Sequence, residues 1–242
     1  MMCRFPRFPA LALAAVLVSG CAGHPPVVQV PPIPVGQSGT LLTSRQAPGG
    51  PAVALGQSWT KKPVQAEATR VHFAWSRKSL VVFAEMDDRQ VGSLATRDNQ
   101  KMWDLGDAFE VFLRAPGVRE YVEIHVTPEN HRLHLRYPPG GLQEIAMGRA
   151  DFPQFFMKAD EMRRIRSAAV RTKSGWNVAL VIPADLVADR PIRAGMTWRF
   201  SVARYDGDRK KTPPVLTASS PYQELGFHRL NEWGTLKFTK NK

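Results

Sequence analysis

The stretch from Trp103 to Val126 constrains the fold of this chain most strongly. Apolar and polar residues alternate in two runs, 109–113 and 121–126, and a period of two is typical of half-buried strands. The connection between the runs contains the pair Pro116-Gly117, which favours a turn. The sequence therefore predicts an antiparallel hairpin.

The two faces of this predicted hairpin differ in chemistry. One face is apolar and carries Phe109, Val111, Leu113, Val122, Ile124 and Val126. The other face carries Glu110, Phe112, Tyr121, Glu123 and His125. A plain sandwich would expose Thr, Ser and Lys at such positions. Carboxylates, an imidazole and aromatic rings instead make this second face the candidate binding face.

The rest of the chain after residue 52 repeats the same pattern. Short alternating runs predict strands at 70–75, 79–86, 131–137, 165–171, 176–182, 198–205 and 233–238. Residues 142–163 fit either a short helix or an irregular flap, and helical periodicity is otherwise almost absent. Many short strands with frequent turns indicate an all-β fold, an antiparallel β-sandwich over residues 52–242.

The first residues indicate export. Arg4 and Arg7 precede the apolar run 10–18, which is too short to span a bilayer as a helix and suits the core of a signal peptide. Small residues then lead directly to Cys21, which resembles the lipobox of bacterial lipoproteins. We predict a signal peptide at 1–20 and a lipidated Cys21. The alternative is an ordinary secretory signal with an incidental cysteine.

Residues 21–51 are rich in proline and glycine, which favours an extended, solvated tether. A first edge strand at 27–30 is the weaker alternative. The chain has a formal charge of +12, and +10 once Arg4 and Arg7 are removed. Because export separates the protein from nucleic acid, this basic surface predicts anionic envelope material as its partner. Ala22 after the cysteine is compatible with sorting to an outer membrane.

The order of several motifs resembles the family 9 carbohydrate-binding modules and their relatives in the DOMON-like superfamily. These motifs are Trp103, the Asp107-x-x-Glu110 strand, Tyr121-x-Glu123, Gly175-Trp176, Trp198-Arg-Phe200, Arg204, Phe227-His228 and Trp233-Gly234. The resemblance implies a β-sandwich that holds a sugar between two aromatic rings. It points to Trp103 as one ring, with Tyr222 at the second position, where relatives often carry Trp. The expected ligand is a poly- or oligosaccharide, with acidic glycans included.

The polar part of such a site would come from Glu110, Glu123, His125 and Arg204, because carboxylate and guanidinium groups suit sugar hydroxyls. The competing interpretation is a buried structural ion pair between Glu110 and Arg204. For Trp103, the alternative to stacking on a ligand is packing in the core or in a loop. Asp87 and Asp88 are weak candidates for a structural calcium site, and exposed turn carboxylates are the alternative.

Catalysis is not expected. Asp107 and Glu110 are three positions apart, so in one strand their side chains point to opposite faces and cannot flank one glycosidic bond. A haem-binding electron-transfer domain is the alternative from another class, with Met86, Met102 and His228 as ligand candidates. A structural envelope lipoprotein without a ligand is the third possibility.

Overall fold

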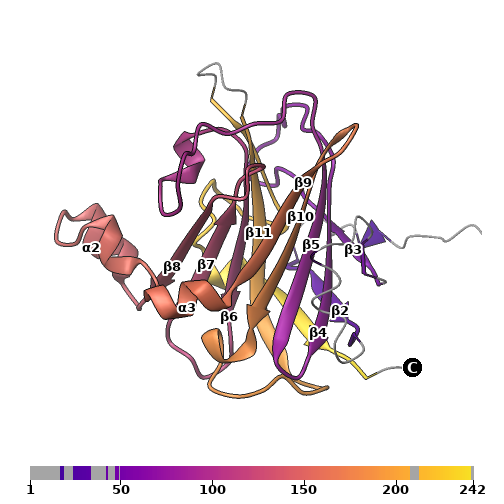
Figure 1. The fold of residues 1–242 in the computed structure, drawn as a ribbon, viewed down its shortest axis with the longest axis vertical. Coiled ribbons are helices and arrows are strands. Elements are labelled where there is room, and N and C mark those ends of the chain that lie inside the picture. The colour runs from indigo at the N-terminus through magenta and orange to yellow at the C-terminus, as the bar shows by residue number, and fades with distance from the viewer. Residues whose placement is uncertain are drawn as a thin grey trace, which may run out of the picture.

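The structure is a computed structural model, and it describes residues 17–18, 24–33, 42, 47–48, 50–207 and 213–240. Cys21 and most of the predicted signal peptide lie outside the described residues. No helix in the described ranges is long and apolar enough to cross a membrane. The predicted antiparallel β-sandwich is confirmed, because two sheets pack face to face (Figure 1).

The first sheet has the strand order β1-β3-β4-β5-β10-β9. Its strands are β1 (Leu17–Val18), β3 (Ala52–Ala54), β4 (Thr69–Ser76), β5 (Ser79–Asp87), β9 (Arg166–Arg171) and β10 (Gly175–Pro183). All neighbours are antiparallel except β1 and β3. The central strand β5 reads as a continuous apolar run because both of its faces are covered.

The second sheet has the order β2-β13-β11-β6-β7-β8, with β12 paired to β11 off this path. Its strands are β2 (Val27–Val30), β6 (Ala108–Arg114), β7 (Tyr121–Val126), β8 (Arg132–Tyr137), β11 (Thr197–Asp206), β12 (Val215–Ala218) and β13 (Gly234–Phe238). The predicted hairpin is β6–β7, with Glu110 opposite His125 and Phe112 opposite Glu123. This register confirms that Glu110, Glu123 and His125 share one face.

The main core fills the space between the sheets, where Phe109, Val111 and Leu113 meet residues of β4, β5 and β10. A second apolar cluster covers the outer face of the second sheet and includes Phe112, Tyr121 and Trp233. Two short helices belong to the connection between β8 and β9, namely α2 (Gly141–Ala146) and α3 (Ala159–Arg164) (Figure 1). The described residues also form 3-10 turns at Met102–Asp104, Phe152–Phe155, Ala184–Leu186 and Leu230–Glu232.

The N-terminal segment differs from the predicted tether. Residues 27–30 form β2 and pair in parallel with β13, and Val28 and Val30 are buried in the main core. Residues 31–33 then continue to β4, where the Trp75 amide donates to the Pro31 carbonyl. The sandwich therefore begins before residue 52, because pairing of β2 with the edge of β13 buries Val28 and Val30 in the main core.

Candidate functional site

A cavity of about 390 Å³ opens on the outer face of the second sheet. Its aromatic walls are Trp103, Tyr137, Phe152, Tyr205 and Phe227. Its polar lining residues are Lys101, Glu110, Glu123 and His228, and Leu142, Ile145, Leu216, Leu225 and Gly226 complete it. Pockets of this size with a few convergent polar groups among apolar walls are typical of small-molecule sites.

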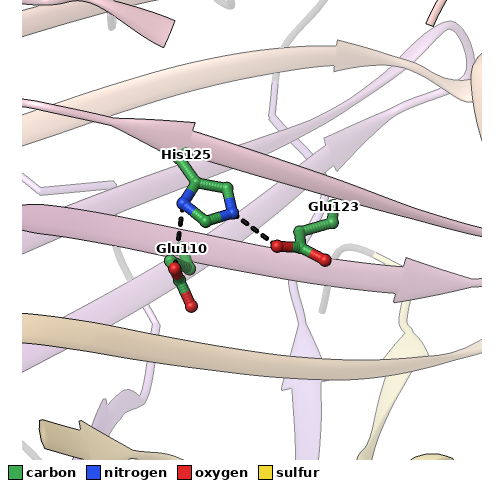
Figure 2. A group of neighbouring side chains, drawn as sticks. All are labelled: Glu110, Glu123 and His125. Atoms are coloured by element: carbon green, nitrogen blue, oxygen red, sulfur yellow. Dashed lines mark hydrogen bonds and ion pairs between the residues drawn. The ribbon is translucent and has the colours of Figure 1, made fainter. Parts of the chain in front are cut away.

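The polar side of the cavity is supported by His125, which lies between two carboxylates (Figure 2). Its Nε2 is 2.5 Å from Oε1 of Glu123, and its Nδ1 is 2.9 Å from Oε1 of Glu110. The second contact is an ion pair without good hydrogen-bond alignment. All three side chains are almost fully buried. The alternation of β6 and β7 brings them to one face, and the imidazole fixes both carboxylates in place.

His125 carries the positive charge of this group. Burial alone would lower the pKa of the imidazole, but the carboxylates of Glu110 and Glu123 outweigh it and raise the pKa to about 10. Burial raises the pKa of Glu110, and the neighbouring His125 opposes that change. One imidazolium between two carboxylates leaves excess acceptor capacity on the cavity floor.

The free acceptor belongs to Glu123. Its Oε2 is buried without a hydrogen-bond partner among the described residues, and it lies 3.6 Å from Nδ1 of His228. The same nitrogen of His228 is 2.8 Å from the hydroxyl of Tyr121. Burying a carboxylate oxygen without a hydrogen bond costs free energy. A ligand hydroxyl that donates a hydrogen bond to this oxygen would remove that cost. His228 belonged to the sequence motif Phe227-His228, yet its place beside Glu123 depends on tertiary packing.

Trp103 is held at the rim by the 3-10 turn Met102–Asp104, whose Met102 is fully buried. The indole lies 5.5 Å from the His125 ring and 5.2 Å from the Phe152 ring, measured between centroids. The first contact places a cationic ring beside an indole, which is favourable. Gly106 follows at φ 117°, where an added Cβ would come within 2.6 Å of the Gly92 carbonyl oxygen. Trp103 therefore lines the cavity from a tightly defined loop.

Tyr222 does not occupy the expected second ring position. The side chain is fully buried, and its hydroxyl donates to the Phe227 carbonyl at 2.7 Å and lies 2.8 Å from Oγ of Ser201. Tyr222 instead supports Phe227, with ring centroids 5.8 Å apart. The rings that the structure places around the cavity with Trp103 are those of Tyr137, Phe152, Tyr205 and Phe227. Phe152 fell within the predicted flap, but the sequence did not mark Tyr205 as a site residue.

Arg204 also lies away from the cavity. It shares the inner face of β11 with Phe200 and Val202, and its Nη2 is 3.0 Å from Oδ2 of Asp88 and 3.3 Å from Oδ1 of Asp206. The predicted pairing with Glu110 is therefore wrong, although a buried structural ion pair does exist. We call Arg204, Asp88, Asp107 and Asp206 the inter-sheet cluster. Burial raises the pKa of Asp107 to about 8, despite amide donors from Gly92 and Gly207.

Each of the two carboxylate clusters contains a cationic side chain of the protein, His125 in one and Arg204 in the other. The ligand atoms of Glu110, Glu123 and His125 lie within 4.8 Å of one another, as do those of Asp88, Asp107 and Asp206. Arg204 donates to Asp88 in the second group. Asp87 is partly exposed and lies 3.5 Å from Arg70. A calcium ion at Asp87 and Asp88 stays a prediction.

A haem site with methionine and histidine ligands, and a sugar site in a larger hollow elsewhere, both fit the geometry less well than a sugar site in the Trp103 cavity. The described residues that line the cavity include His228 but no methionine, and Met86 and Met102 are buried in two different apolar clusters. A larger hollow of about 1020 Å³ lies beside Trp75, Arg77 and Arg166. Trp75 is the one aromatic residue among the described residues lining it. The described carboxylates that line this hollow, Asp185 and Asp189, are exposed, unlike Glu110 and Glu123 of the Trp103 cavity.

Three solved structures resemble this fold. A candidate carbohydrate-binding protein from Bacteroides uniformis ATCC 8492 superposes with a TM-score of 0.67 at 15% identity, over 89% of this chain and 99% of that one. A family 9 carbohydrate-binding module from Caldicellulosiruptor kristjanssonii, in complex with cellotriose, gives 0.58 at 14% identity over 90% and 95%. The same kind of module in complex with glucose gives 0.57 at 13% over 90% and 97%. No protein-family model and no curated protein sequence matches the chain. The chain therefore has the β-sandwich fold of these structures.

Proposed function

We propose that this protein is a non-catalytic carbohydrate-binding module that holds a sugar in the Trp103 cavity. The observation that carries the proposal is the combination of aromatic walls with the buried carboxylates of Glu110 and Glu123. A pyranose has an apolar face of C–H bonds, which suits flat rings, and a rim of hydroxyls, which suits fixed acceptors. The structural likeness to modules that bind cellotriose and glucose supports this choice.

The positions of the carboxylates support binding without catalysis. Glu110 and Glu123 come from the adjacent strands β6 and β7 and both contact His125. They therefore approach a ligand from one side, whereas glycoside hydrolysis needs two carboxyl groups that flank the scissile bond. Asp107 is turned away, toward the amides of Gly92 and Gly207.

The test of binding is a glycan array on the chain from Ala22 onward, which retains β2, followed by titration calorimetry. Trp103→Ala should weaken the sugar at least several-fold, because loss of one stacking ring costs at least ~1 kcal/mol. Tyr222→Phe is the matched control, because its ring stays in place behind Phe227, and it should bind like the wild type. Equal affinity of Trp103→Ala and wild type would remove the cavity from the site. An absence of any bound glycan, with the fold intact, would favour a structural role.

We propose further that a lipid on Cys21 anchors the module to the bacterial cell envelope, with the outer membrane as its location. The six residue steps from Cys21 to Val27 then span at most about 22 Å, so the sandwich lies close to the membrane. Cys21→Ser should release the protein from the membrane fraction, because no other anchor is visible in the sequence. A variant that resists a carbonate wash as well as wild type would show that the anchor lies elsewhere.

A further inference from the structure

A second cavity, of about 480 Å³, adjoins the Trp103 cavity on the same face of the second sheet. The two cavities share Leu142 and His228 as lining residues, so they form neighbouring compartments. The second compartment differs in charge, because it is lined by Arg114 and Arg119 and by no carboxylate among the described residues.

Three arginines at this end of the sheet have no acidic partner among the residues that the structure describes. Arg114 and Arg199 are directly opposite each other on β6 and β11, and Arg119 lies in the turn after β6. Within the described chain no carboxylate lies within ion-pair distance of any of the three. Arg114 donates to the Val118 carbonyl at 2.9 Å, and Arg199 donates to the carbonyls of Leu230 and Asn231 at 3.2 and 3.3 Å.

This arrangement is electrostatically unfavourable without an anion. Like charges opposite each other on adjacent strands destabilise a sheet. Partial burial and the neighbouring Arg114 lower the pKa of the Arg199 guanidinium. Glu120, which directly follows Arg119 in the sequence, is 3.7 Å from Arg136 instead. An oxyanion bound at Arg114 would relieve the repulsion and accept hydrogen bonds from the free guanidinium nitrogens.

We propose that the second compartment binds an acidic substituent, a carboxylate, sulfate or phosphate, of the same glycan whose neighbouring sugar ring occupies the Trp103 cavity. The proposal rests on the carbohydrate-binding function and narrows its ligand to an acidic glycan. The aromatic compartment holds the ring and the arginine compartment selects for charge. His228 lies between them and lines both compartments.

The test pairs each neutral oligosaccharide with its uronic-acid or sulfated counterpart in titrations of the full chain. Wild type should bind the acidic member at least tenfold more tightly, and this preference should shrink at high salt. Arg114→Gln should lose the preference and keep its affinity for the neutral member. Arg193→Gln removes the same charge from an exposed site outside both cavities and should behave like wild type. Equal affinity of wild type for both members would overturn the proposal.

Inorganic phosphate tests the anion site without any sugar. At constant ionic strength, millimolar phosphate should raise the melting temperature of wild type and of Arg193→Gln more than that of Arg114→Gln. In buffer without polyvalent anions, Arg114→Gln should melt close to wild type, because relief of the repulsion with Arg199 offsets the lost hydrogen bond to the Val118 carbonyl. If no glycan binds, the proposed function fails on its own, and an Arg114-dependent phosphate response still upholds the anion site. An equal response of all three proteins would contradict it.

Discussion

The Glu110–His125–Glu123 group and the inter-sheet cluster are alike in composition and opposite in setting. Both hold buried carboxylates around one cation, and both draw on β6 or the residue before it. In the inter-sheet cluster Arg204 points inward and donates to Asp88, the Asp87 carbonyl and Thr69. In the other group Oε2 of Glu123 lies beside a cavity and has no hydrogen-bond partner among the described residues. Buried charge alone is therefore weak support for a binding site, and it is the spare acceptor at a cavity wall that favours the proposed sugar site at Glu123.

Removal of the cation from the inter-sheet cluster should have the largest effect. Arg204→Met leaves Asp88 and Asp206 without their counter-charge, and loss of one partner of a buried pair costs about 3 to 5 kcal/mol. Chemical denaturation measures this loss in the free energy of unfolding. Arg190→Met is the control, because Arg190 pairs with Asp189 on the surface, and it should unfold like wild type. A small loss of stability in Arg204→Met would show that the two clusters do not differ in their contribution to the free energy of unfolding.

The two clusters should also differ in the pH range over which their contributions to stability are lost. The pKa of Asp107 is raised from 3.8 to about 8, so its contribution to stability is full below pH 3.8 and is lost as the pH rises through 8. The pKa of His125 is raised from 6.5 to about 10, so its contribution is full below pH 6.5 and is lost as the pH rises through 10. Melting temperatures between pH 5 and pH 10 should therefore fall by several degrees in two overlapping phases. A flat profile above pH 8 would mean that His125 is neutral.

Neutralising one carboxylate of the outer group should cost less than losing Arg204. Glu110→Gln retains the shape of the side chain and leaves His125 paired with Glu123, so we expect a loss of about 1.5 to 3 kcal/mol. The alkaline phase of the pH profile should shift to lower pH, because one of the charges that raise the pKa of His125 is gone. Sugar affinity should fall as well. Unchanged stability together with lost binding would show that Glu110 serves only the ligand.

The smallest effect is expected at Tyr222. Tyr222→Phe removes the hydrogen bond to the Phe227 carbonyl, which is worth about 0.5 to 1.5 kcal/mol. Thermal melts measure that loss, and calorimetry with a bound glycan should show unchanged affinity. A drop in affinity larger than the drop in stability would return Tyr222 to the binding site.

The sequence predicted the position of a side chain best where alternation within one strand decides which face of the sheet it lies on. Alternation in β6 and β7 was enough to bring Glu110, Glu123 and His125 to one face. The same rule places Arg204 on the face of Phe200 and Val202, so the signal for its inward direction was present in the sequence. Tyr222 and Phe227 could not be placed in this way, because the segment after β12 folds over the sheet without a regular period. The partner of β2 was likewise hidden, since pairing of distant segments leaves no local pattern.

The pairing of β2 with β13 also governs the order in which the chain can fold. The Val30 carbonyl accepts a hydrogen bond from the hydroxyl of Thr239, which is 209 positions later. Contacts between such distant segments close a very long loop and slow folding. Val28 and Val30 must wait without their partner strand until nearly all of the chain has been made. If the chain is exported from its N-terminus as proposed, β2 emerges among the first strands and is incorporated last.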